Sequence, residues 1–157
     1  MSYFGFKGGI KWPFFSWHLY GYNVDKNIKF YELYVADDEG TEIKYDARAV
    51  PPTLTTPLRR LAERMTTMSE VEINEIGTFL YKGACSYRQK IKSGSISLKK
   101  LVKFPSHQFG FKWDVENLNS LNEFTCLRVY KVKAELSEDG TTLIGIEREK
   151  QLDLRFK

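Results

Sequence analysis

Two acidic turns that end in glycine constrain the fold most, because each lies between two segments that favour β-structure. The turns cover residues 37–40 and 137–140, and their glycines supply the positive φ that tight turns require. The flanking segments, all rich in β-branched and aromatic residues, are 28–35, 41–45, 124–135 and 143–148. This pattern predicts one β-hairpin near each end of the 157-residue chain.

Two helices are expected between the hairpins, within residues 57–92. The first begins with Thr56 as its N-cap and with a proline in its first turn. A capping box formed by Ser69 and Glu72 begins the second helix, whose apolar residues recur at helical spacing to about residue 90. This second helix should be the longest element of the chain.

The order of strands, helices and strands predicts an α+β fold. We expect an antiparallel sheet built from an N-terminal and a C-terminal hairpin, with the two central helices packed on one face. Gly77 and Gly83 weaken the long helix by about 1 kcal/mol each unless another element packs closely against them. The length fits one domain, 1–157. Its expected segments are an aromatic-rich N-terminal arm (1–22), a hairpin (28–46), the helices (57–92), an irregular basic and aromatic segment (93–122), and a hairpin with a last strand (124–157).

An aromatic segment, residues 11–22 (KWPFFSWHLYGY), lies outside all of these elements, and no acid precedes Asp25. Such a segment must be buried, laid on a membrane surface or held against a partner. Tryptophan and tyrosine favour the membrane interface, and Lys7 and Lys11 lie nearby. Equally, these rings could cover one end of the sheet. The residues expected to contact a membrane or protein partner are Trp12, Phe14, Phe15, Trp17 and Tyr20.

A basic segment, residues 76–113, contains eight lysines and arginines and no Asp or Glu. Its cations alternate with aromatic residues, a pattern that could hold phosphates and stack bases. The alternative without a binding function is that these cations form a solvated face, where those at the C-terminal end of a helix are stabilised by the helix dipole. The residues expected to bind nucleic acid or another polyanion are Lys90, Lys92, Lys99, Lys100 and Lys103.

Residues that could carry catalysis are sparse. His18 and His107 lack neighbouring ligands at zinc-site spacing, and no hydrolase, phosphate-loop or calcium-loop motif occurs. Cys85 and Cys126 are expected to be two buried thiols, although a disulfide would be possible in an oxidising compartment. We therefore expect no catalytic residue, cofactor or metal, and an enzyme of unrecognised type is the third hypothesis.

The segment around WPFFSWHLYGY, followed by a hairpin and by Pro51 and Pro52, resembles the soluble extracytoplasmic part of uncharacterised polytopic bacterial membrane proteins. The resemblance covers mainly residues 12–52 and implies a position beside a membrane, with no catalytic residues. The chain has no apolar run near the ~20 residues that span a bilayer and no secretory leader. We expect a cytoplasmic protein if the chain is complete, and an extracytoplasmic one if it is a fragment. The leading hypothesis is a non-catalytic interaction module, and its oligomeric state is open.

Overall fold

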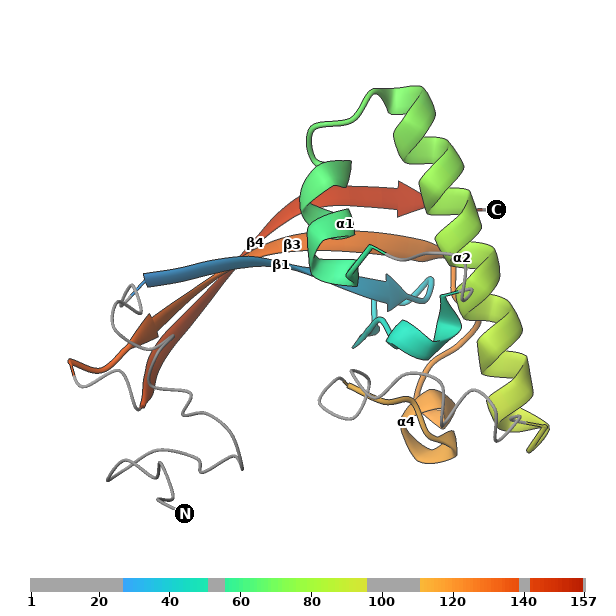
Figure 1. Cartoon of the computed structure of the whole chain (residues 1–157). Coiled ribbons are helices and arrows are strands. Elements are labelled where there is room, and N and C mark those ends of the chain that lie inside the picture. Colours follow the sequence, from blue (N-terminus) through green and yellow to red (C-terminus); the bar gives the residue numbers. More distant parts are fainter. Residues whose placement is uncertain (1–26, 51–55, 96–110, 139–141, 157) are drawn as a thin grey trace, which may run out of the picture. The chain divides into compact units, whose positions relative to one another are not determined.

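The computed structural model describes residues 27–50, 56–95, 111–138 and 142–156 of the chain (Figure 1). The chain divides into two compact units. The first unit is Met1–Ile28 with Lys133–Ile146, and the second is Lys29–Val132 with Glu147–Lys157. The helices and most of the hydrophobic core belong to the second unit.

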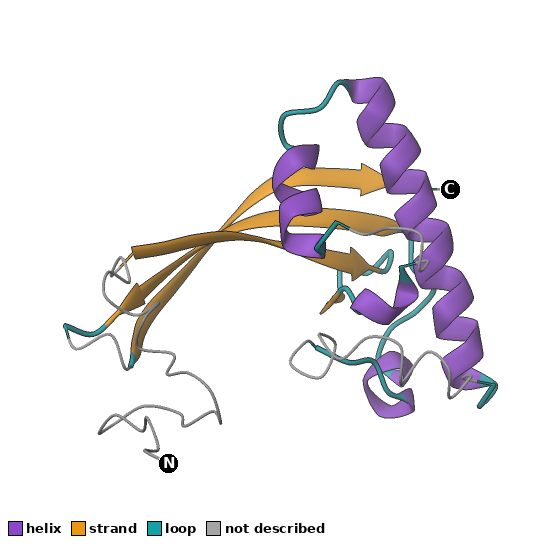
Figure 2. Cartoon of the chain, in the orientation of Figure 1, coloured by secondary structure: helices purple, strands orange, loops and turns teal. Residues whose placement is uncertain are grey.

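The sheet has four strands in the order β2-β1-β3-β4, shown in orange in Figure 2. The strands are β1 (Asn27–Ala36), β2 (Glu42–Lys44), β3 (Cys126–Leu136) and β4 (Leu143–Arg155). β1 and β2 are antiparallel, with Tyr34 opposite Lys44 and Val35 opposite Ile43. The predicted α+β fold with hairpins from both ends of the chain is confirmed. β4 runs without a break, so the predicted return strand and last strand form one element.

The helices are α1 (Leu58–Met65), α2 (Glu70–Lys92), the five-residue α4 (Val115–Asn119) and the short 3-10 helix η2 (Ala47–Ala49). The capping box that begins α2 is confirmed, since Ser69 and Glu72 bond each other's backbone N–H. The predicted Thr56 N-cap is wrong. Pro57 is the N-cap of α1, because its ψ of 138° is extended and its carbonyl accepts the first helical bond, from Leu61.

The hydrophobic core lies between the helices and one face of the sheet (Figure 1). Leu33 and Val35 of β1 point into this core, while Glu32 and Tyr34 are buried on the other face, so this half of β1 is covered on both faces. The fully or almost fully buried residues that share this cluster with them include Leu61, Met65, Leu80, Ala84, Tyr87, Leu127 and Val129. Burial of one such leucine or valine side chain stabilises the fold by roughly 1.5–3 kcal/mol.

Two glycines allow α2 to approach its neighbours closely. A Cβ at Gly83 would lie 2.7 Å from the carbonyl oxygen of Ala49 in η2. A Cβ at Gly77 would lie 2.8 Å from Cδ1 of Leu154 in β4. Another element therefore packs closely against each of the two glycines, which is the condition under which glycine was expected to be tolerated inside this helix.

The other face of the sheet in the second unit carries a polar and aromatic network. The carboxylate of Glu32 pairs with Lys44 and accepts a 2.9 Å hydrogen bond from the Tyr34 hydroxyl. The ring of Tyr34 meets that of Tyr130 edge-on, with centroids 5.4 Å apart. Arg128 forms an ion pair with Glu42 on this face as well, with 3.1 Å between Nη1 of Arg128 and Oε2 of Glu42. These pairs explain how charged residues are accommodated on a largely covered sheet.

Candidate functional site

The five aromatic residues expected to contact a partner (Trp12, Phe14, Phe15, Trp17, Tyr20) lie outside the described residues, as do His18 and His107. The described part of the first unit exposes several apolar side chains. Leu143 is 49% exposed, Ile144 64% and Ile146 50%. Ile28, the last residue of the N-terminal part of this unit, is 37% exposed.

The three exposed large apolar residues of β4 lie on an edge strand, the last in the sheet order. Because side chains alternate along a strand, Ile144 and Ile146 share one face and Leu143 points to the other. The neighbouring part of β3 exposes Lys133 and Glu135. By sequence, the first unit contains four lysines and four acids, so this apolar surface belongs to a unit without net charge.

Of the predicted polyanion-binding residues, Lys90 and Lys92 are exposed in the last turn of α2. Lys99, Lys100 and Lys103 fall outside the described residues. Arg88, in the same basic segment, is buried and is 8% exposed.

Of the aromatic residues of the basic segment that the structure describes, three are packed against other residues. Tyr87 and Trp113 are core residues with 1% and 3% of their surface exposed. Tyr81 stacks on Phe156 at a centroid distance of 4.4 Å. Phe79 and Phe111 remain exposed, at 43% and 42% of their surface. Stacking of bases on Tyr87 or Trp113 would therefore require the core to open.

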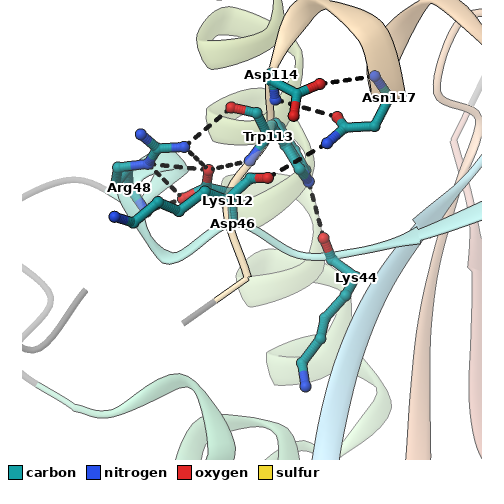
Figure 3. Close-up of polar contacts among 7 residues, drawn as sticks. All are labelled: Lys44, Asp46, Arg48, Lys112, Trp113, Asp114 and Asn117. Carbon is teal, nitrogen blue, oxygen red and sulfur yellow. Dashed lines mark hydrogen bonds and ion pairs between the residues drawn. The ribbon is translucent and has the colours of Figure 1, made fainter. Parts of the chain in front are cut away.

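A buried polar cluster ties the end of the first hairpin to the chain at residue 113 (Figure 3). Asp46, 1% exposed, begins η2 by accepting a 2.8 Å hydrogen bond from the backbone N–H of Arg48. The Nε of Arg48 lies 3.0 Å from both Asp46 carboxylate oxygens. Asp46 also accepts a 2.8 Å bond from the backbone N–H of Trp113. The carboxylate is thus surrounded by donors.

Trp113 takes part in this cluster through both its backbone and its side chain. Its carbonyl accepts a 3.1 Å bond from Nη2 of Arg48, and its indole Nε1 donates to the carbonyl of Lys44 at 2.8 Å (Figure 3). The hydrogen bonds from Arg48 to Asp46 raise the pKa of the guanidinium above its ordinary value, although burial opposes this shift. The hydrogen bonds of this cluster all join groups within the fold, so the cluster serves to hold the structure together.

A pocket of about 260 Å³ opens along the C-terminal half of α2. The lining residues from α2 are Tyr81, Cys85, Arg88, Gln89 and Lys92. Glu123 and Phe124, which precede β3, form the opposite side. The pocket therefore combines two cations, one carboxylate, a thiol and two aromatic rings.

The groups of this pocket are not poised for nucleophilic chemistry. Burial raises the pKa of the Cys85 thiol, which keeps it protonated at neutral pH. Burial and the neighbouring thiol also raise the pKa of Tyr81 to about 12, and its hydroxyl donates to the carbonyl of Phe124 at 2.7 Å. Cys85 and Cys126 are both free. The arrangement is suited to binding rather than to bond cleavage.

Within residues 27–50, 56–95, 111–138 and 142–156, no cluster of three metal-ligating side chains occurs. Across these same ranges, no helix has both the length and the apolar composition to cross a membrane.

Two features of the site were not anticipated. The Asp46 cluster joins residues 67 positions apart in sequence, and no local pattern signals it. The burial of Arg88 did have a signal, since this residue follows Tyr87 and lies four positions after Ala84 on the apolar face of α2. No family model, curated protein or solved structure matches the chain.

Proposed function

We propose that this protein is a non-catalytic interaction module that docks on a membrane surface through its aromatic segment 11–22 and the apolar side chains of its first unit. The observation that carries the proposal is the exposure of Leu143, Ile144 and Ile146, which is 49%, 64% and 50% of their surface. These residues and the aromatic segment belong to the same unit. The resemblance of residues 12–52 to extracytoplasmic domains beside membranes supports the same conclusion.

Apolar transfer accounts for the energy of docking. Each buried methylene contributes roughly 0.8 kcal/mol, so insertion of the exposed parts of Ile144 and Ile146, which share one face of β4, contributes a few kcal/mol. Tryptophan and tyrosine rings in the headgroup region add to this. Because the first unit has no net charge, attraction to anionic lipids is not required. Binding should therefore occur on zwitterionic vesicles and change little with salt.

The test is co-sedimentation of the full chain with phosphatidylcholine vesicles at low and high salt. We expect the double variant Ile144→Asp, Ile146→Asp to bind at least about tenfold more weakly, because two charges would have to leave water. Charged residues are well tolerated on edge strands, so this variant should fold. The variant Trp12→Ala, Trp17→Ala should lose binding to a similar extent.

The matched control is Val71→Asp, which places a charge at an equally exposed apolar residue in the first turn of α2, in the second unit. It should bind vesicles like the wild type. Failure of the wild-type chain to bind these vesicles would overturn the proposal and leave a protein partner as the occupant. Equal loss of binding in the control would also overturn it.

A second function, binding of nucleic acid or another polyanion, is favoured by the exposure of Lys90 and Lys92 in the last turn of α2. Single-stranded DNA is a suitable probe. Affinity should fall steeply with salt, and the variant Lys90→Gln, Lys92→Gln should reduce the slope of log affinity against log salt by about 1.4. An affinity that does not respond to salt would exclude this function.

A further inference from the structure

We propose that the pocket along α2 binds a small organic acid that carries one carboxylate on an apolar body. This site is distinct from the membrane-docking surface, because all of its lining residues belong to the second unit. The argument rests on a buried cation that forms no ion pair with any residue that the structure describes, on the charge balance of the pocket and on its apolar walls.

Arg88 is the buried cation. Its Nη2 donates to the carbonyl of Leu121 at 2.6 Å, and its Nη1 donates to the carbonyl of Asn122. Its guanidinium lies 4.6 Å from the centroid of the Phe124 ring. These contacts use two of the five N–H donors of the side chain. Among the described residues Arg88 forms no ion pair. A buried charge without a counter-ion is unfavourable, so an anion that reaches it gains both a charge partner and a hydrogen bond.

The helical spacing of α2 gathers the other groups beside this cation. Cys85 and Gln89 are four residues apart, as are Arg88 and Lys92, so they lie along one side of the helix. Gln89 and Lys92 are exposed and mark the open rim. A ligand would therefore meet the ammonium and the amide at the rim and the guanidinium further in.

The charges of the pocket favour one negative charge on the ligand. Arg88 and Lys92 supply two positive charges and Glu123 supplies one negative charge, so a monoanion neutralises the site. A phosphate dianion would be repelled by Glu123. The planar fork of an arginine also matches a carboxylate in geometry.

The walls and the volume of the pocket limit which apolar body the ligand can have. Tyr81, Cys85 and Phe124 provide apolar surface. A volume of about 260 Å³ lies just below the range of roughly 300–1,000 Å³ that holds drug-sized ligands. The fitting class is a small aromatic or branched aliphatic acid, for which benzoate is a suitable probe.

The first experiment is a titration of the isotopically labelled full chain with benzoate, followed by backbone amide shifts in two-dimensional NMR. We expect shifts at residues of α2 and at Glu123 and Phe124, with a Kd on the order of 1 mM for a ligand of this size. Benzamide, which has the same shape without the charge, and inorganic phosphate should each bind at least about fivefold more weakly.

Three variants test the charge balance. Lys92→Met should weaken benzoate binding by about fivefold, and Glu123→Gln should tighten it by about threefold. Lys90→Met is the matched control, because Lys90 is exposed in the same turn of α2 and does not line the pocket. It should leave the affinity for benzoate unchanged, although it should weaken binding of a polyanion.

A second readout reports on the pocket itself. Cys85 lines the pocket and is partly exposed, whereas Cys126 is buried outside it. Saturating benzoate should slow alkylation of Cys85 by at least about threefold and leave Cys126 unaffected. The proposal is overturned if benzamide binds as well as benzoate, if Lys90→Met and Lys92→Met have equal effects, or if the shifts map away from the pocket.

Discussion

At the residue scale, Asp46 illustrates how one carboxylate can organise distant parts of the second unit. It begins η2 through the backbone of Arg48, pairs with the guanidinium of Arg48 and accepts from the backbone N–H of Trp113. All of its neighbours are donors. A neutral amide in the same place would direct an N–H group at one of them, and the buried guanidinium would lose its counter-ion.

Asp46→Asn is therefore expected to lower the free energy of unfolding by roughly 3–5 kcal/mol, the range for breaking a buried ion pair. Urea unfolding followed by tryptophan fluorescence measures this loss. The control is Asp114→Asn at the exposed N-cap of α4, where asparagine caps as well as aspartate and the change should be below about 0.5 kcal/mol. Similar small losses at both positions would show that Asp46 is not the centre of the cluster.

Glu32, on the face of the sheet away from the hydrophobic core, should make the stability of the fold depend on pH. Burial alone would raise the pKa of its carboxyl, but the hydrogen bonds from Lys44 and Tyr34, aided by Arg148, outweigh burial and lower it. A carboxyl with a lowered folded-state pKa stabilises the fold above its unfolded pKa. That contribution is lost as pH falls through the folded pKa.

The stability difference between wild type and Glu32→Gln should therefore be largest at neutral pH and shrink from about pH 5 downward. Urea midpoints measured between pH 7 and pH 3 provide this comparison. A difference between wild type and Glu32→Gln that stays constant with pH would contradict the role assigned to Glu32.

At the scale of elements, the packing of α2 depends on two glycines that face different atoms. A methyl group at Gly83 would meet a backbone carbonyl of η2, which cannot rotate away. A methyl group at Gly77 would meet the end of the flexible Leu154 side chain. Alanine raises helix propensity by about 1 kcal/mol at either site.

Gly83→Ala should consequently destabilise the protein by roughly 1–3 kcal/mol, because overpacking exceeds the gain in propensity. Gly77→Ala should change stability by less than about 1 kcal/mol, because Leu154 can adopt another rotamer. Thermal unfolding of the two variants side by side tests the difference. A Gly83→Ala protein as stable as the wild type would mean that η2 can move away from α2.

Local patterns explain which elements could be predicted from the sequence. Both hairpins and α2 were predicted because turn glycines, a capping box and apolar periodicity are short-range signals. The start of α1 was misplaced by one residue, since a Thr-Pro pair does not reveal which residue is extended. The helix α4 was missed although Asp114 and Asn117 form a capping box, because it has only five residues.

The candidate sites were harder to predict because they depend on contacts between distant residues. By charge alone, Arg88 belongs with Lys90 and Lys92. In the structure, however, Arg88 is buried and donates to carbonyls more than 30 positions away in sequence. Nothing in the sequence near Asp46 indicates that Trp113 will meet it. The exposed apolar residues of β4 lie at positions 143, 144 and 146, and the strand pattern of the sequence does not indicate that they are exposed.

At the scale of the whole molecule, the two thiols report on how the second unit opens. Cys85 is partly exposed on α2, and Cys126 is buried at the start of β3. Both belong to the second unit. A buried thiol becomes reactive only when the structure around it opens, so its labelling rate measures the free energy of that opening.

We expect Cys85 to react under native conditions at a rate nearly independent of urea. Cys126 should react at least about a thousandfold more slowly, and its rate should rise with urea with the slope of global unfolding, because β3 lies in the middle of the sheet. Mass spectrometry after timed alkylation separates the two sites, and denatured protein without reductant should show two free thiols. If Cys126 instead reacts at a rate that ignores urea, β3 opens locally and the second unit does not unfold as one cooperative body.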